Sequence, residues 1–213
     1  MNLRNSAVLT AITLALALPA MSTAATIVAN GSFEEGTEGL TTPSWTTYET
    51  LPGWTIYSPH GLEIQTAGTL GLTPSDGDHY AELDGYENSL IVQFITLASG
   101  WYTGSFDYSP RIDGITDTND ILVGILELGA FFISGPDGVN TVVGEWTTFS
   151  QTFFADAGTY TLFFAGAGTE DSLGGLIDNI QIVPAAVPVP AAGFMLFGAL
   201  GGLAALRRRR ATA

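Results

Sequence analysis

Short runs of alternating or aromatic-rich residues fill the middle of this chain, and clusters of Gly, Pro, Asn and Asp separate them. This pattern predicts β-strands joined by turns and leaves almost no amphipathic helix. Asp156-Ala157-Gly158 is expected to form a tight turn between two of the runs. About eight to ten short strands at this spacing are typical of a two-sheet sandwich or jelly roll, so we expect an all-β fold. The clearest predicted strands are 54–57, 62–65, 79–83, 90–97, 101–108, 121–128, 145–154, 159–165 and 176–183.

The start of the chain predicts export. Arg4 precedes an apolar or small-residue stretch at 7–18, Pro19 ends it, and Ser22-Thr23-Ala24 offers the small residues that a signal peptidase reads. Residues 1–25 are therefore expected to be a secretory signal peptide that signal peptidase removes. The β-sandwich domain is expected to cover 26–183.

The end of the chain has three parts, a Pro-rich linker at 184–190, an apolar run at 191–206 and an Arg-rich tail at 207–213. The apolar run would span roughly 24 Å as a helix, slightly short of the ~17–25 residues of a stable membrane span. We expect a weakly held transmembrane helix. Positive charges directly after an apolar segment stay in the cytoplasm, which places the domain on the other side of the membrane. These charges are Arg207, Arg208, Arg209 and Arg210.

A proline motif lies directly before the apolar run and consists of Val187, Pro188, Val189, Pro190 and Ala191. The motif, the apolar run and the arginines together resemble the PEP-CTERM class of sorting signals in its VPxPA-type variant. The resemblance implies transient insertion into the inner membrane, cleavage near the motif by an exosortase-type enzyme, and delivery to the cell surface or extracellular matrix of a Gram-negative bacterium. The alternative is a tail anchor that is never cut, which leaves a membrane-anchored ectodomain.

The charge balance of the domain is strongly acidic. Arg111 is the only Lys or Arg between residues 26 and 183, which contain all 21 Asp and Glu residues, so this part carries a net charge of −20. Electrostatic repulsion excludes nucleic acid and anionic lipid surfaces as partners. The same charge density favours a divalent cation, although acidity also keeps a secreted protein soluble. The chain has no cysteine, so disulfides and thiol catalysis are excluded.

Three groups of residues occur in a recognisable order. The first is Asn30-Gly31-Ser32-Phe33-Glu34, followed by Leu51-Pro52-Gly53-Trp54; the second is 74–85; the third is Gly175-Leu176-Ile177-Asp178-Asn179-Ile180. Together they resemble the galactose-binding-like jelly roll of carbohydrate-binding modules. The resemblance covers essentially the whole domain and implies a galactose-binding-like jelly-roll β-sandwich, with sugar binding as the expected activity.

The same resemblance implies a structural calcium ion. In this fold the first and last strands are neighbours, so Glu34 and Asp178 are expected to converge and to hold Ca²⁺ together with nearby backbone carbonyls. A hard cation needs several such oxygens, and two buried acids are costly unless they are neutralised. The alternative is that Asp178 caps a turn and Glu34 faces water.

Aromatic side chains that are exposed in loops could stack on sugar rings, and the candidates are Trp45, Tyr57, Tyr86 and Trp101. Such residues more often pack in the core or at its rim than on a ligand. Trp54, in the Pro-Gly-Trp position of the first motif, is expected to be a core residue.

No catalytic motif is present. His60 and His79 are the only histidines, and neither a Gly-x-Ser-x-Gly elbow nor a His-Glu-x-x-His helix occurs. Glu82 and Asp84 share a strand face and could form the carboxylate pair of a glycosidase, but acids at alternate positions of an edge strand favour a solvated face. We therefore expect a non-catalytic protein.

Two functions remain at this point. The first is a surface-sorted module that binds carbohydrate, for example an exopolysaccharide. The second is a structural or adhesive matrix protein that self-associates, or bridges through calcium, without sugar affinity.

Overall fold

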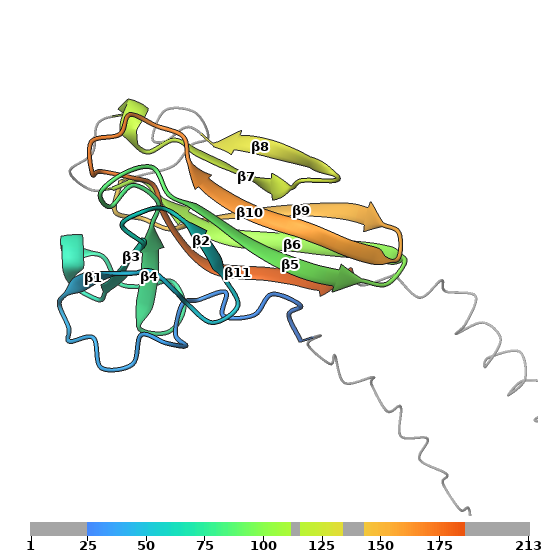
Figure 1. The fold of residues 1–213 in the computed structure, drawn as a ribbon, viewed down its shortest axis with the longest axis horizontal. Coiled ribbons are helices and arrows are strands. Elements are labelled where there is room, and N and C mark those ends of the chain that lie inside the picture. The colour runs from blue at the N-terminus through green and yellow to red at the C-terminus, as the bar shows by residue number, and fades with distance from the viewer. Residues whose placement is uncertain (1–24, 112–115, 134–142, 186–213) are drawn as a thin grey trace, which may run out of the picture.

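The computed structural model describes residues 25–111, 116–133 and 143–185. They form two β-sheets that pack face to face, and all paired strands are antiparallel (Figure 1). The all-β sandwich prediction is confirmed. One sheet contains, in spatial order, β1 (Trp45–Tyr48), β3 (Leu62–Thr66), β4 (His79–Glu82), β11 (Leu176–Pro184), β6 (Gly100–Ser109) and β9 (Thr147–Ala155). The other contains β2 (Thr55–Tyr57), β5 (Leu90–Leu97), β10 (Gly158–Gly166), β7 (Ile121–Ile125) and β8 (Gly129–Ile133). Two short 3₁₀ turns lie at Thr69–Gly71 and Thr116–Thr118.

All nine predicted strands are present, but β1 and β8 were missed. The predicted strand at 121–128 is wrong beyond Ile125, because the chain turns there and returns as β8. The Leu128 amide closes this turn on the Ile125 carbonyl at 2.9 Å, and the Glu127 carboxylate accepts a hydrogen bond from the Thr161 amide at 2.9 Å. The predicted tight turn is confirmed, since β9 ends at Ala155 and β10 begins at Gly158.

Aromatic side chains join the two sheets. Phe106 on β6 meets Phe164 on β10 edge-to-face, with ring centroids 5.1 Å apart. Trp54 packs edge-on against Phe164, with ring centroids 6.3 Å apart, and stacks on Phe33 at 6.0 Å. Trp54 is buried in the core, so its predicted role is confirmed. Its indole N–H still has an acceptor, the Asn30 carbonyl at 2.9 Å, and this combination of apolar burial with a satisfied polar group is what favours Trp in a core.

The start of the described chain packs along the last strand. The Ile27 amide donates to the Ile182 carbonyl at 2.8 Å, and the Ile180 amide donates to the Gly31 carbonyl at 3.0 Å. Glycine is required at position 31, because a Cβ there would lie 2.1 Å from the Ile180 carbonyl oxygen. The first and third sequence motifs are therefore neighbours, as the family resemblance implied.

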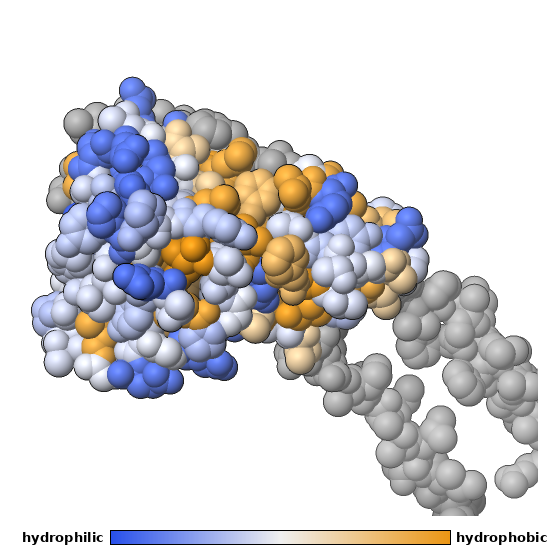
Figure 2. All heavy atoms as spheres, viewed as in Figure 1, coloured by the Kyte–Doolittle hydropathy of each residue, from blue (hydrophilic) through white to orange (hydrophobic). Residues whose placement is uncertain are grey.

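The sandwich has two distinct ends, between which β6 runs. At the exit end, Gly100 pairs with Ala155, and the Ala185 amide donates to the Trp101 carbonyl at 2.8 Å. At the loop end, Ser109 pairs with Leu176 and the chain continues to Arg111. Hydrophilic residues gather at the loop end and apolar ones along the strands toward the exit end (Figure 2).

The predicted signal peptide, proline motif, transmembrane helix and arginine tail lie outside the described residues. Within the described part, no helix has the length and apolar character needed to cross a membrane.

Candidate functional site

The loop end contains a pocket of about 300 Å³ beside the first strands of the six-stranded sheet. Sites for small ligands begin at about this volume, and a pocket of this size suits one small unit of a ligand rather than a long chain. Several segments that are distant in sequence meet here: β1 with β3, the 3₁₀ turn at Thr69–Gly71, the turn that the Asp84–Asn88 bridge closes, the segment after β6, and the loop before β11. The lining residues are Trp45, Glu63, Gln65, Thr69, Leu70, Gly85, Tyr86, Arg111 and Ser172.

Two half-exposed aromatic rings form one wall of the pocket. Trp45 on β1 is 47% exposed and Tyr86 is 55% exposed, and their rings meet edge-on with centroids 6.4 Å apart. His60 also packs against Tyr86, with ring centroids 5.5 Å apart. Large aromatic side chains are normally buried, so an exposed pair beside a pocket marks a surface on which a flat apolar face can pack.

Charged and amide groups form the floor of the pocket. Gln65 Nε2 donates to Glu63 Oε1 at 2.8 Å and also to Glu82 Oε2. Arg111 Nη1 forms an ion pair with Glu82 Oε1 at 2.6 Å and donates to the Ser172 carbonyl. The Glu82 carboxylate is fully buried, whereas Glu63, Gln65 and Arg111 reach the pocket. The floor therefore offers both hydrogen-bond donors and acceptors to a ligand.

The electrostatics of this floor follow from burial and from the strand register. Glu63 and Glu82 are directly opposite each other on β3 and β4. Burial, with the neighbouring Glu63 as a second cause, raises the pKa of Glu82 to about 8, although Arg111 opposes the shift. Burial also raises the pKa of Glu63. Glu63 and Glu82 are two acids beside a single cation, Arg111. Full ionisation of both would leave one negative charge unbalanced, so the pair retains a proton near neutral pH.

Glu82 and Asp84 correct one prediction. Both are fully buried, so the solvated strand face expected for them is wrong. The reason is topological: β4 lies between β3 and β11 rather than at an edge, and the loop before β11 covers both acids. The Gly174 amide donates to Glu82 Oε1 at 2.8 Å, and the Asp171 amide donates to Asp84 Oδ2 at 3.0 Å.

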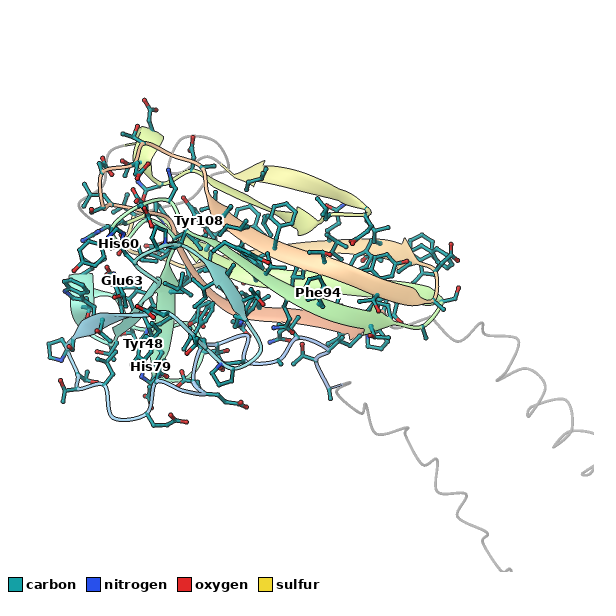
Figure 3. The ribbon with its side chains drawn as sticks, viewed as in Figure 1. Tyr48, His60, Glu63, His79, Phe94 and Tyr108 are labelled. Carbon is teal, nitrogen blue, oxygen red and sulfur yellow. The ribbon has the colours of Figure 1, made fainter. Side chains whose placement is uncertain are left out.

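The four aromatic candidates separate into two groups. Trp45 and Tyr86 meet at the pocket, as described above. Tyr57 is exposed on β2 of the other sheet, and Trp101 is exposed at the exit end against Phe154. Figure 3 shows His60 and Glu63 together at the loop end, far from the exposed Phe94 on β5.

Sequence reasoning missed the polar residues of the pocket, Glu63, Gln65 and Arg111. Glu63 and Gln65 alternate with Leu62 and Ile64 in β3, and Arg111 is the only Lys or Arg of the acidic domain. Neither pattern identifies a buried group by itself, because polar residues at alternate strand positions usually mark a solvated face.

Glu34 and Asp178 hold the same loop from two sides. The Asp78 and His79 amides donate to Glu34 Oε1 at 2.7 and 2.9 Å, and His79 Nδ1 lies 2.6 Å from Glu34 Oε2. The Ser75 and Asp76 amides donate to Asp178 Oδ2 at 2.8 and 3.0 Å. The two predicted calcium ligands are thus brought to one segment, residues 75–79.

Backbone amides and one hydroxyl surround the buried Asp178 carboxylate. The Ser75 hydroxyl lies 2.7 Å from Asp107 Oδ2 and 3.2 Å from Asp178 Oδ2, and it has only one proton to donate. Burial raises the pKa of Asp178 to about 7. Within the described part of the chain, no cluster of three or more His, Asp or Glu side chains is arranged to hold a metal ion. A cation at this point would therefore depend on hydroxyl and backbone oxygens beside the carboxylates, and these are ligands that suit calcium.

The fold is similar to that of solved carbohydrate-binding modules. TmCBM61, solved in complex with beta-1,4-galactotriose, matches with a TM-score of 0.52 over 76% of this chain and 99% of that chain, at 13% identity. A family 35 carbohydrate-binding module from Clostridium thermocellum matches at 14% identity over 68% of this chain and 100% of that chain, with a TM-score of 0.40. At such low identity the likeness concerns the fold alone, and the match to TmCBM61 shows a jelly roll of the carbohydrate-binding-module type.

Sequence comparison finds parts of two large toxins. Multifunctional-autoprocessing repeats-in-toxin proteins of Vibrio cholerae serotype O1 and Vibrio vulnificus are 29% and 28% identical to this chain over 158 residues. These residues cover 72% of this chain, but the chain spans only 3% of the length of either toxin. No protein-family model matches the sequence.

Proposed function

We propose that this protein is an exported, non-catalytic module that binds a neutral saccharide in the loop-end pocket. The observation that carries this proposal is the pair of half-exposed rings, Trp45 and Tyr86, beside the polar floor formed by Glu63, Gln65 and Arg111. A sugar ring has an apolar C–H face and a rim of hydroxyl groups that both donate and accept. In the pocket, the aromatic wall can contact the C–H face, and the polar floor can hydrogen-bond with the hydroxyl groups.

The charge of the domain favours a neutral ligand over an acidic one. Only one Arg or Lys accompanies 21 acids between residues 26 and 183, and that residue, Arg111, is already paired with Glu82. A polyanionic polysaccharide would be repelled by the surrounding carboxylates. Neutral oligosaccharides, such as the beta-1,4-galactotriose bound by TmCBM61, are therefore the first ligands to test.

The geometry supports binding rather than hydrolysis. A glycosidase needs two carboxyl groups that both reach the scissile bond. Glu82 is fully buried beneath Gln65 and Arg111, and Glu63 is the only acid that lines the described pocket. A saccharide in the pocket would meet one carboxyl group and an aromatic wall, which is a recognition site without a second catalytic acid.

The proposal includes a structural Ca²⁺ held by Glu34 and Asp178 with oxygens of the 75–79 segment. Two features support it. Both carboxylates accept hydrogen bonds from backbone amides of the same loop. Asp178 is also buried beside Asp107, without a basic partner among the described ion pairs. Bound calcium would supply the missing positive charge and fix the loop.

The proposal also includes the export and sorting of the protein. Signal peptidase would remove residues 1–25, and an exosortase-type enzyme would cut near Val187–Ala191 and deliver the domain to the cell surface or matrix. Mass spectrometry of the mature protein from a host with its own sorting enzyme tests this step. A mature chain that ends near Pro190 supports sorting, and a chain that retains Arg207–Arg210 contradicts it.

Calorimetric titration tests the binding site. Beta-1,4-galactotriose, a panel of other neutral oligosaccharides and extracted extracellular polysaccharide are the probes. Trp45→Ala and Tyr86→Ala are each expected to weaken binding about tenfold or more, because each removes an aromatic contact. Trp101→Ala removes an equally exposed ring at the exit end and serves as the matched control.

The outcome that contradicts the proposal is equally specific. If no neutral saccharide binds at millimolar concentration, or if Trp101→Ala weakens binding as much as Trp45→Ala does, the loop-end pocket is not the site.

A further inference from the structure

An apolar slot of about 570 Å³ lies between the two sheets, away from the loop-end pocket. Its lining includes residues of the outermost strand β9 and of the β7–β8 turn, so the slot reaches the edge of the sandwich. Aromatic and aliphatic side chains dominate the lining. They include Phe106, Phe149, Phe153, Val123, Leu162 and Phe164. The side chains that line an empty apolar space of this size lose van der Waals contacts unless another group packs against them.

Two exposed leucines lie beside the slot. Leu126 and Leu128, in the turn between β7 and β8, are both strongly exposed, and Leu128 also lines the slot. Figure 2 shows apolar side chains over this part of the sandwich. Contiguous exposed apolar surface on a protein of this charge marks an interaction site rather than ordinary solvated surface.

The strand next to the slot, β9, is an edge strand among the described residues. Within the described residues, β9 pairs only with β6, so its other side forms no ladder with another described strand. It is nine residues long, compared with four in β1, three in β2 and five in β8, the other edge strands. Thr147–Ala155 contains no charged residue and no proline. Natural edge strands usually carry such residues to prevent pairing with another chain.

We propose that β9 is the self-association surface of this protein, and that a second copy adds its own β9 in antiparallel register. The charge distribution restricts where two copies can meet: copies that each carry −20 in this domain repel one another except where both surfaces lack acids, and the uncharged β9 is such a surface, with an edge that can pair with a copy of itself. Pairing about Gln151 places Ser150 opposite Thr152 of the partner subunit. It joins the two six-stranded sheets, so that the slots of both copies adjoin beneath one continuous sheet.

The test uses the purified full chain with charges introduced on the exposed face of β9. Ser150→Asp/Thr152→Asp places like charges directly opposite one another in the proposed dimer, and we expect the dimer dissociation constant to rise about tenfold or more. Thr96→Asp/Ser99→Asp adds the same charge at exposed positions on and beside β5 and is the control. Multi-angle light scattering over a concentration series gives the dissociation constants at low and high salt.

Hydrogen exchange shows whether β9 itself forms the contact between two copies, even if another segment of the chain also associates. The amides of β9 are expected to gain protection as the wild-type concentration rises, and this gain is expected to disappear in Ser150→Asp/Thr152→Asp. A wild-type protein that stays monomeric overturns the proposal. So does a dimer that the β9 variant and the control weaken equally, or one that forms without added protection in β9. Because saccharide binding is measured at the other end of the sandwich, failure of either proposal leaves the other testable.

Discussion

The two ends of this sandwich carry similar aromatic pairs in different surroundings. At the loop end, Trp45 and Tyr86 are 47% and 55% exposed, with centroids 6.4 Å apart. At the exit end, Trp101 and Phe154 are 56% and 46% exposed, with centroids 5.6 Å apart. The loop-end pair stands beside Glu63, Gln65 and Arg111 in a pocket, whereas the exit-end pair lines neither that pocket nor the slot between the sheets.

Exposed aromatic rings do not define a saccharide site by themselves. What distinguishes the loop end is the buried polar floor, which gives a ligand hydrogen-bonding partners that are already held in place. Burying such groups costs stability unless each has a partner. The exit end is built from short turns and strand ends and has no comparable buried charge among its described residues, so the two ends should respond differently to substitution, calcium and pH.

Removal of the Arg111 guanidinium should have the largest effect. Arg111→Ala leaves the buried Glu82 carboxyl without its ion pair, and we expect the free energy of unfolding to fall by about 3 kcal/mol or more at pH 9. The loss should be smaller at pH 6, where the Glu82 carboxyl is protonated. Urea denaturation of Arg111→Ala and Trp101→Ala at both pH values measures the difference. If both variants lost the same free energy of unfolding at each pH, the loop end would not differ from the exit end in its buried charge.

Calcium should stabilise the protein through the Glu34–Asp178 loop. If the dissociation constant is about 10 μM, 1 mM Ca²⁺ adds roughly 2.7 kcal/mol to the free energy of unfolding. Asp178→Asn should remove this increment. Asp156→Asn, in the turn of the exit end, is the control and should retain it. Thermal melts of metal-stripped protein with and without Ca²⁺ provide the measurement, and an unchanged melting temperature on calcium addition in the wild type contradicts the site.

The buried acids should make the metal-free protein lose stability as pH rises. The pKa of Glu82 is raised from 4.5 to about 8 and that of Asp178 from 3.8 to about 7, so the folded state binds more protons than the unfolded state within these ranges. The free energy of unfolding therefore falls between about pH 4 and pH 8. Glu82→Gln should flatten the upper part of this range. A wild-type stability that rises from pH 5 to pH 8 would contradict these protonation states.

A pair of glycine substitutions gives the smallest predicted effects. A Cβ at Gly85 would lie 2.7 Å from the Glu63 Cβ, so Gly85→Ala should destabilise the protein by about 1 kcal/mol and weaken saccharide binding by displacing Glu63. At the exit end a Cβ on Gly158 would meet Tyr160 at an ordinary 3.6 Å, so Gly158→Ala should change stability by less than about 0.5 kcal/mol. Comparable losses in both variants would show that the packing around Glu63 is not special.

The fold was largely predictable because period-two patterns and turn residues are local signals. Nine strands and the turn after Ala155 followed from them. β1 and β8 did not: β1 (Trp45–Tyr48) has no apolar alternation, and β8 continues the apolar run that begins with β7, so only tertiary contacts reveal the turn at Leu126–Leu128.

The site was less predictable because it is assembled from residues that are distant in sequence. Trp45 and Tyr86 were chosen by residue type, as were Tyr57 and Trp101, and nothing local separates the two groups. Glu82 looked solvated because the sequence does not show that β4 is interior to the sheet or that Arg111 folds back to it. The polar partners of the pocket emerge only from the sheet order.

The indole N–H signals of the four tryptophans test the central claim most directly. Trp54 and Trp146 donate to the Asn30 and Thr73 carbonyls, while Trp45 and Trp101 mark the two ends of the sandwich. On titration with a neutral oligosaccharide that binds, the NMR signal of Trp45 is expected to shift and that of Trp101 to stay in place. A shift of Trp101 with Trp45 unchanged would contradict the account.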